Sequence, residues 1–186
     1  MRLVGRLLLG LLALFVVLAA AAYLLPRQVT VTRDVEVAAP PETVFPYVNS
    51  LQKTAQWSPW TDLDPDMKIT YAGPEQGVGN RMTWTSDDPR VQTGSQEIMV
   101  SQPDARVETA LHFGDMGVAT AWLVLKPQNG GTLVTWGLQA DTGTSPVGRY
   151  TGLMLDHWIG ADFEKGLTRL KGLVEAGKRK APGVNR

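Results

Sequence analysis

The side chains able to transfer a proton are scattered along this chain and match no catalytic motif. The candidates are His112, Glu97 and Glu108 in a strand-rich region, and Asp156 and His157 in a helical one. A general base must lie within hydrogen-bond distance of the proton that it removes, and no spacing among these five brings two of them together. A lone histidine is more often structural than catalytic. We therefore assign no catalytic residue.

Metal and nucleophile signatures are also missing from the sequence. The chain has no cysteine, and its two histidines lack the spacing of a zinc motif. Asp62, Asp64 and Asp66 alternate as in a calcium loop, but Met67 stands where that loop needs glycine, and the distal glutamate is missing. No Gly-x-Ser-x-Gly elbow of a serine hydrolase is found. We predict no metal and no cofactor, and a solvated acidic loop at the aspartates.

An apolar segment near the N-terminus is long enough to cross a bilayer. Leu7 to Leu25 contains no charge, amide or proline, and at helical rise it spans about 28 Å. Arg2 and Arg6 precede it, which predicts a single-pass anchor with the N-terminus in the cytoplasm and the domain on the outer, periplasmic or extracellular, side. A cleaved secretory signal is the alternative, because Ala20 to Ala22 supplies small residues for a peptidase.

The charge balance limits the partners of the exported part. The chain has 18 basic and 18 acidic residues, and two of the basic ones lie before Pro26. The remainder is slightly acidic, which argues against a nucleic-acid partner. We predict a transmembrane segment over 1–26, one domain over 27–177, and a basic flexible tail over 178–186.

The pattern after the anchor changes from strand to helix, to strands, and to helix again. A Val- and Thr-rich run from Val29 predicts a first strand that ends before Pro40. Apolar residues at Val44, Tyr47, Val48 and Leu51 then predict a helix. Pro46 should kink or shorten it. Six further strands are predicted at 67–72, 80–86, 94–101, 106–113, 118–126 and 132–140.

A long helix closes the domain. Thr144 or Ser145 can cap it, and an apolar stripe follows for more than four turns. The stripe consists of Ile159, Phe163, Leu167, Leu170 and Val174. The fold class is therefore α+β: a curved antiparallel sheet of about seven strands wraps around the terminal helix, and a ligand cavity is left between them.

Five short stretches carry a resemblance to a known family: AAPPETVF (38–45), QWSPW (56–60), GPEQGVG (73–79), TW (135–136) and IGADFEKGL (159–167). They resemble the START-like helix-grip superfamily (SRPBCC), specifically its polyketide cyclase/dehydrase and lipid-transport branch. The resemblance implies a helix-grip fold and a ligand cavity, but no catalytic signature that can be placed on numbered residues. The membrane segment and Pro46 depart from the pattern.

The leading hypothesis is a membrane-anchored START-like domain that binds a hydrophobic small molecule, lipid or isoprenoid-like. Burial of apolar ligand surface would drive binding without catalysis. The glycine-containing start of the last helix, Ser145 to Gly152, is the predicted entry gate. The predicted lining residues are Trp84, Trp122, Trp136, Met154, Trp158 and Phe163.

Two other classes of function stay open at this point. An enzyme such as a cyclase, dehydratase or hydrolase would need a carboxylate or histidine in the pocket. A noncatalytic interaction module would fill the cavity with its own side chains. No protein partner can be named from the sequence. Trp57 and Trp60 are expected to lock their loop onto the core, with a pocket mouth or a membrane-interface belt as the alternatives.

Overall fold

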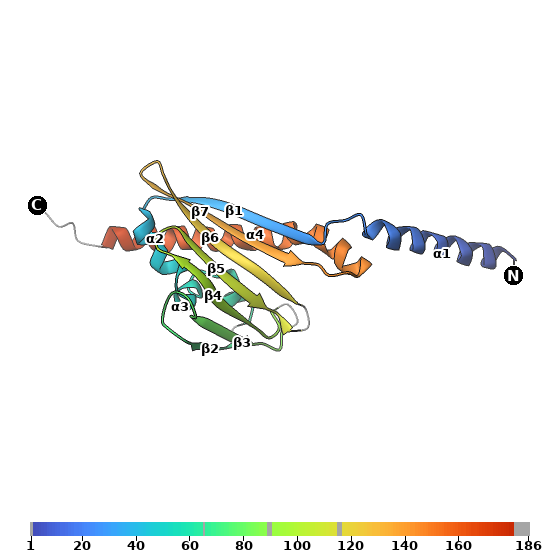
Figure 1. Ribbon diagram of the computed structural model, residues 1–186, viewed down its shortest axis with the longest axis horizontal. Coiled ribbons are helices and arrows are strands. Elements are labelled where there is room, and N and C mark those ends of the chain that lie inside the picture. The colour runs from blue at the N-terminus through green and yellow to red at the C-terminus, as the bar shows by residue number, and fades with distance from the viewer. Residues whose placement is uncertain (1, 65, 89–90, 115–116, 181–186) are drawn as a thin grey trace, which may run out of the picture.

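The computed structural model describes residues 2–64, 66–88, 91–114 and 117–180. Helix α1 (Arg2–Ala22) projects from one end of a domain in which a seven-stranded sheet packs against helices (Figure 1). The strands are β1 (Gln28–Val37), β2 (Lys68–Ala72), β3 (Arg81–Thr85), β4 (Gly94–Gln102), β5 (Arg106–His112), β6 (Val118–Gln128) and β7 (Gly131–Asp141). The remaining helices are α2 (Pro41–Val48), α3 (Leu51–Thr54), the 3-10 helix η1 (Pro59–Asp62) and α4 (Pro146–Lys180).

The sheet confirms the predicted antiparallel α+β fold. Its strand order is β1-β7-β6-β5-β4-β3-β2, so β2 to β7 form a meander and β1 joins it through β7. Asn129 and Gly130, with φ of 52° and 76°, form the tight turn between β6 and β7. In β4 the register shifts between Ile98 and Val100. A bulge of this kind bends and twists a strand, which contributes to the curvature of the sheet.

The predicted helix after the first strand is divided into α2 and α3. Pro46 lies inside α2, and the chain leaves the helix at Asn49 before α3 starts. Asn80, which is 3% exposed, holds this junction. Its Oδ1 accepts a hydrogen bond from the Leu51 N–H at 2.8 Å, and its Nδ2 donates to the Pro74 carbonyl at 2.7 Å. The N–H group at the buried start of α3 thereby finds its hydrogen-bond acceptor in Asn80, a side chain that no sequence pattern had singled out.

Helix α4 packs mainly along β1 and presents the predicted apolar stripe to the core. Phe163, Leu167, Leu170 and Val174 are at most 1% exposed. The Ser145 hydroxyl accepts a hydrogen bond from the Gly148 N–H at 3.0 Å, as expected of a cap. The helix is described to Lys180, so it includes the first three residues, 178–180, of the expected flexible tail. Residues 181–186 lie outside the described part.

The glycines at the start of α4 allow close packing. A Cβ at Gly148 would lie 2.1 Å from the Thr142 carbonyl oxygen. One at Gly152 would lie 2.8 Å from the Thr142 Cγ2 and 3.1 Å from the Val29 Cγ2. These contacts tie the start of α4 to the ends of β1 and β7. The idea that this segment opens as a gate stays a prediction.

Gly166 permits an equally close approach in the middle of α4, and we expect Gly166→Ala to destabilise the domain. The added Cβ would lie 2.7 Å from the buried Trp136 ring and 3.1 Å from Pro59. Overpacking of this kind costs about 1–3 kcal/mol.

The matched control is Gly172→Ala on the exposed side of the same helix, where a Cβ meets nothing within 4 Å. It should stabilise the protein by up to about 1 kcal/mol, because alanine favours a helix more than glycine does. Denaturant unfolding of both variants provides the measurement. Equal effects of the two substitutions would contradict the close packing at Gly166.

Candidate functional site

Four aromatic rings fill the space between the sheet and the middle of α4. We call them the aromatic cluster: Trp57, Trp60, Trp136 and Phe163. Trp136 of β7 stacks on Phe163 of α4 with ring centroids 4.1 Å apart and an interplanar angle of 7°. The rings of Trp57 and Trp60 meet Trp136 edge-on at 5.0 and 5.5 Å. The cluster occupies the position that the sequence analysis assigned to the ligand cavity, and it locks the Trp57–Trp60 loop onto the core as expected.

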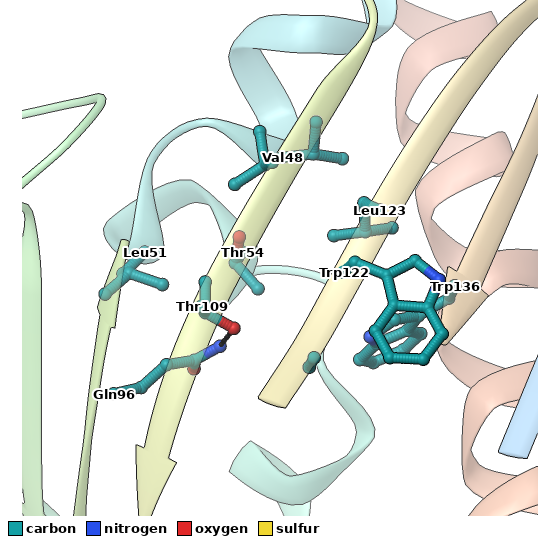
Figure 2. A pocket seen from close by; sticks show the side chains of 10 residues that line it. Val48, Leu51, Thr54, Gln96, Thr109, Trp122, Leu123 and Trp136 are labelled. Carbon is teal, nitrogen blue, oxygen red and sulfur yellow. Dashed lines mark hydrogen bonds between the residues drawn. The ribbon is translucent and has the colours of Figure 1, made fainter. Parts of the chain in front are cut away.

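A small cavity lies beside the cluster, under α2 and α3 (Figure 2). Its volume is about 20 Å³, enough for one water molecule. Sites for small molecules usually measure about 300–1,000 Å³. The residues that line it are Val48, Leu51, Thr54, Gln96, Val107, Thr109, Ala121, Trp122, Leu123 and Trp136. The described lining contains no residue of α4, which differs from the expected position between sheet and terminal helix, because Trp136 and Phe163 close that space.

The cavity wall is apolar except for a few uncharged polar groups. On the sheet side, the Gln96 Nε2 donates a hydrogen bond to the Thr109 Oγ1 at 3.0 Å. Thr109 is 6% exposed. No titratable side chain is among the described lining residues. The wall can therefore bury apolar surface and hydrogen-bond one polar group of a ligand, but the described lining offers no side chain for proton transfer at neutral pH.

The acid–base candidates from the sequence lie outside this cavity. Glu97 forms an ion pair with Arg81, and Glu108 forms one with Arg106, each at 2.5 Å. The two glutamates alternate with inward-facing residues of β4 and β5 and point to the opposite side of the sheet. His112 is exposed at the end of β5. The structure does not bring these side chains together.

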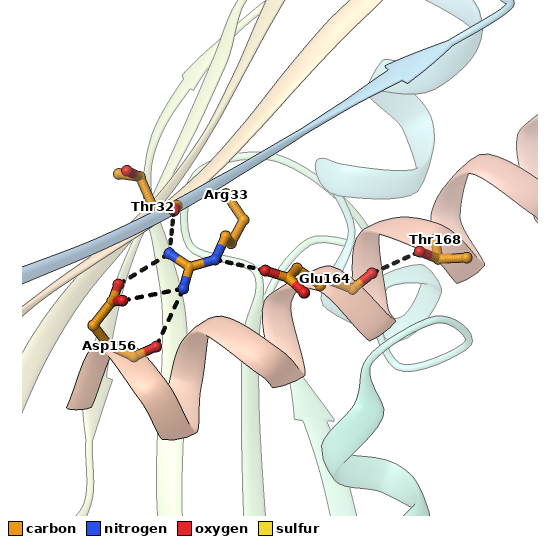
Figure 3. Close-up of polar contacts among 5 residues, drawn as sticks. All are labelled: Thr32, Arg33, Asp156, Glu164 and Thr168. Carbon is orange, nitrogen blue, oxygen red and sulfur yellow. Dashed lines mark hydrogen bonds and ion pairs between the residues drawn. The ribbon is translucent and has the colours of Figure 1, made fainter. Parts of the chain in front are cut away.

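Asp156 has a structural partner. Arg33 of β1 donates to Asp156 and Glu164 of α4, in each case at 2.9 Å, and joins the edge strand to the helix (Figure 3). The hydrogen bond from Arg33 lowers the pKa of Asp156 below its usual value. His157, the next residue, is exposed.

This ion pair predicts a pH-dependent contribution of Asp156 to stability. A carboxylate whose folded pKa is depressed stabilises the fold above its unfolded pKa, and that contribution disappears as the pH falls through the folded value. Asp156→Asn should therefore be less stable than the unsubstituted protein at neutral pH, and the difference should shrink as the pH falls below about 4 and vanish once the pH is below the depressed folded pKa. Thermal unfolding across this range measures it. A difference that persists at acid pH would show that Asp156 acts through packing instead.

The acidic loop is tied to the terminal helix. Asp62 accepts a hydrogen bond from Arg169, which lowers the pKa of its carboxyl group, and Lys165 lies 3.6 Å away. Asp64 accepts a hydrogen bond from the Ser86 hydroxyl at 2.5 Å. Among the residues that the structure describes, no group of three His, Asp or Glu side chains could hold a metal ion.

The six predicted lining residues occupy four different places. Trp136 and Phe163 lie in the aromatic cluster, and Trp136 also lines the cavity. Trp84 is 7% exposed and meets Phe113 edge-on at 6.0 Å. Trp84 lies on β3 and Phe113 directly follows β5, so this pair is separate from the four rings of the aromatic cluster.

The other three predicted residues point away from the interior. Trp122 borders the cavity, but it alternates with buried residues of β6, and a Cβ at Gly137 would lie 2.2 Å from its ring, so the indole covers the outer face of the sheet. Met154 and Trp158 are each 48% exposed on α4. Contact of these residues with a ligand stays a prediction.

Sequence reasoning missed the polar pair Gln96–Thr109 and the small residue Ala121 in the cavity wall. A signal for Thr109 was present, because it alternates in phase with Val107 and Leu111 and therefore shares their face. No comparable signal identifies Gln96. Its place follows from the pairing of β4 with β5, which sets it opposite Leu111.

Comparisons with known proteins agree with this architecture. The family model described as polyketide cyclase / dehydrase and lipid transport matches residues 28–175. Solved structures share the fold. They include the di-domain ARO/CYC StfQ from the steffimycin biosynthetic pathway, with a TM-score of 0.61 and 13% identity over 81% of this chain and 52% of that one.

Two bacterial proteins match over nearly their whole length. One from Rhodobacter sphaeroides has a TM-score of 0.57 and 18% identity, over 80% of this chain and 93% of its own. One from Mycobacterium smegmatis has a TM-score of 0.55 and 19% identity, over 80% of this chain and 92% of its own. No curated protein matches the sequence. Likeness at these identities shows a common fold, whereas the family model covers most of the chain. The chain belongs to the polyketide cyclase / dehydrase and lipid transport family.

Proposed function

We propose that this protein is a membrane-anchored domain that binds a hydrophobic small molecule, lipid or isoprenoid-like, between its curved sheet and the helices that cover it. The observation that carries the proposal is the cavity wall: it is mostly apolar and contains the hydrogen-bonded pair Gln96–Thr109. Such a wall suits a ligand with a hydrophobic body and one polar group. The family suggests hydrophobic ligand binding or a cyclase-like function. The uncharged described lining favours binding over turnover.

Binding requires the cavity to expand, and we propose that displacement of the short helix η1 provides the space. Trp136 lines the cavity, and its ring is held in place by Trp60 of the short helix η1. Helix η1 contacts α4 through the surface ion pairs of Asp62 and through the packing of Pro59 and Trp60 against that helix. Surface ion pairs contribute little to stability, because water and salt screen them. Displacement of η1 with Trp60 would free apolar space beside Trp136, and each Å² of ligand surface buried there would yield about 25 cal/mol.

The anchor in this proposal is α1. Leu3–Ala22 is long and apolar enough to cross a membrane, and within that span only Ala22, its last residue, is buried. We place the N-terminus in the cytoplasm and the domain on the outer side. The anchor then corresponds to 1–26, the domain to 27–177 and the tail to 178–186. The cleaved-signal alternative predicts a mature chain that lacks this helix, and the intact mass of protein purified from membranes distinguishes the two.

The proposed function is tested by organic extraction of the purified full-length protein followed by mass spectrometry. The reference is an unrelated single-pass protein purified in the same detergent, because both carry bulk lipid. We expect one hydrophobic compound class to be enriched in the extract of this protein. If the two extracts have the same composition, the binding proposal is wrong.

A further inference from the structure

The start of α4 exposes an unusual amount of apolar surface for a helix in a domain. The exposed side chains there are Val147 (75%), Tyr150 (38%), Leu153 (59%), Met154 (48%) and Trp158 (48%). Further along the helix, by contrast, Phe163, Leu167 and Leu170 are buried against the sheet. An exposed apolar patch of this kind on one element marks a contact surface.

The charged side chains at the start of α4 are compatible with contact between this surface and an apolar environment. Between Pro146 and Trp158 the charged residues are Arg149 and Asp156. Arg149 donates to the carbonyls of Gly143, at 3.0 Å, and of Leu25. Asp156 is bound by Arg33 on the side facing β1. Both charges are therefore partnered, which lowers the cost of a poorly hydrated environment.

The contacts of this surface place it beside the end of the anchor. The Tyr150 hydroxyl donates to the Leu18 carbonyl at 2.9 Å. Leu18 precedes the end of α1 at Ala22 by four residues, or about 6 Å of helix. The hydroxyl therefore lies alongside the last turn of the apolar span. Figure 1 shows α1 leaving the domain at the end where α4 begins.

We propose that the first turns of α4 lie in the outer headgroup boundary of the membrane, with Val147, Tyr150 and Met154 against lipid and Trp158 at the rim. This inference rests on the proposed membrane anchor. Tyrosine and tryptophan favour this boundary because one end of each side chain is apolar and the other forms hydrogen bonds. In this arrangement the exposed surface at the start of α4 contacts the same bilayer that α1 enters. The domain is held at a fixed angle instead of swinging on a flexible linker.

Nitroxide labels on single cysteines test the proposal, because the natural chain has no cysteine. The full-length protein is placed in nanodiscs of phosphatidylcholine and phosphatidylglycerol. Its label is exposed to oxygen, which concentrates in lipid, and to a polar nickel complex, which stays in water. The variants are Val147→Cys at the proposed surface, Leu12→Cys in the middle of α1, and Leu173→Cys near the far end of α4, where the side chain is 37% exposed.

We expect nickel accessibility at position 147 to be several-fold lower than at 173, with the oxygen-to-nickel ratio at 147 lying between those at 173 and 12. Equal nickel accessibility at 147 and 173, with position 12 in lipid, would overturn the surface proposal and leave the anchor standing. High accessibility of the label at position 12 to the nickel complex would contradict the proposal that α1 spans the membrane, and with it the inference that rests on that proposal. Spin–spin broadening at position 147 would show that a second copy of the chain covers this surface, which also overturns the inference.

Discussion

Replacement of Ala121 by phenylalanine is expected to abolish the binding of the hydrophobic ligand. Ala121 is 5% exposed on the inner face of β6, and its methyl group forms part of the cavity wall. A cavity of about 20 Å³ has no room for a benzyl group, so the new side chain would occupy the space that a ligand needs. The amount of compound extracted per chain should fall to the level of the reference protein. The extraction assay measures this directly.

The matched control for that substitution is Ala110→Phe. Ala110 lies on the neighbouring strand β5, but it alternates with the inward-facing Thr109 and Leu111 and therefore faces the outer side. It should retain the ligand. Because overpacking can cost about 1–3 kcal/mol, the folded state of both variants is checked by circular dichroism. A folded Ala121→Phe variant that retains the full amount of compound would exclude this cavity as the binding site.

Phe163→Ala should produce the largest loss of stability. Its ring is fully buried and stacks on Trp136 at 4.1 Å in the aromatic cluster. Removal of a buried phenylalanine ring costs about 3–5 kcal/mol, because apolar burial is lost and a cavity remains. The free energy of unfolding from denaturant titration, in a mild detergent, is the quantity to measure.

Trp158→Ala serves as the control on the same helix, since that ring is 48% exposed. In detergent it should change the free energy of unfolding by no more than about 0.5 kcal/mol. A small effect of Phe163→Ala would show that the aromatic cluster is loosely packed, and that the space between the sheet and α4 is already available to a ligand.

The fold could be predicted from the sequence because each element carries a strong local signal. The strand from Gly131 to Asp141 alternates apolar and polar residues, and the Asn129–Gly130 turn sets its register with β6. The apolar stripe of α4 repeats with helical period, and every member from Phe163 onward is buried. The break between α2 and α3 depends on Asn80, which is distant in sequence, and local patterns cannot reveal such a contact.

The candidate site was less predictable, because it depends on which face of each element turns inward. Large aromatic residues were expected to line a cavity, but Trp136 and Phe163 stack on each other and fill the space. Trp122 is one position out of phase with the inner face of β6. In a strand a shift of one residue moves a side chain to the opposite face. Apart from Trp122 and Trp136, the walls of the actual cavity consist of smaller residues, and the apolar ones among them carry no signal that distinguishes them from the rest of the core.

The exposed residues Met154 and Trp158 illustrate a different limit. Their apolar character predicted a buried lining, yet in the structure they lie on the exposed surface at the start of α4. Sequence periodicity locates the apolar positions of a helix, but it does not state whether protein, ligand or lipid covers them. The hydrogen bond between Tyr150 and Leu18 joins the start of α4 to α1, and the proposal that lipid covers this surface rests on it.

Native mass spectrometry of the full-length protein, released from detergent micelles in the gas phase, tests the binding proposal most directly. An enclosed ligand should survive the removal of detergent and lipid, so we expect a single additional mass per chain, matching the compound enriched by extraction. The Ala121→Phe variant should show the bare chain mass under the same conditions. A wild-type protein that is folded and shows only the bare chain mass, or a ladder of several lipid adducts, would contradict the claim that one hydrophobic molecule is held inside the domain.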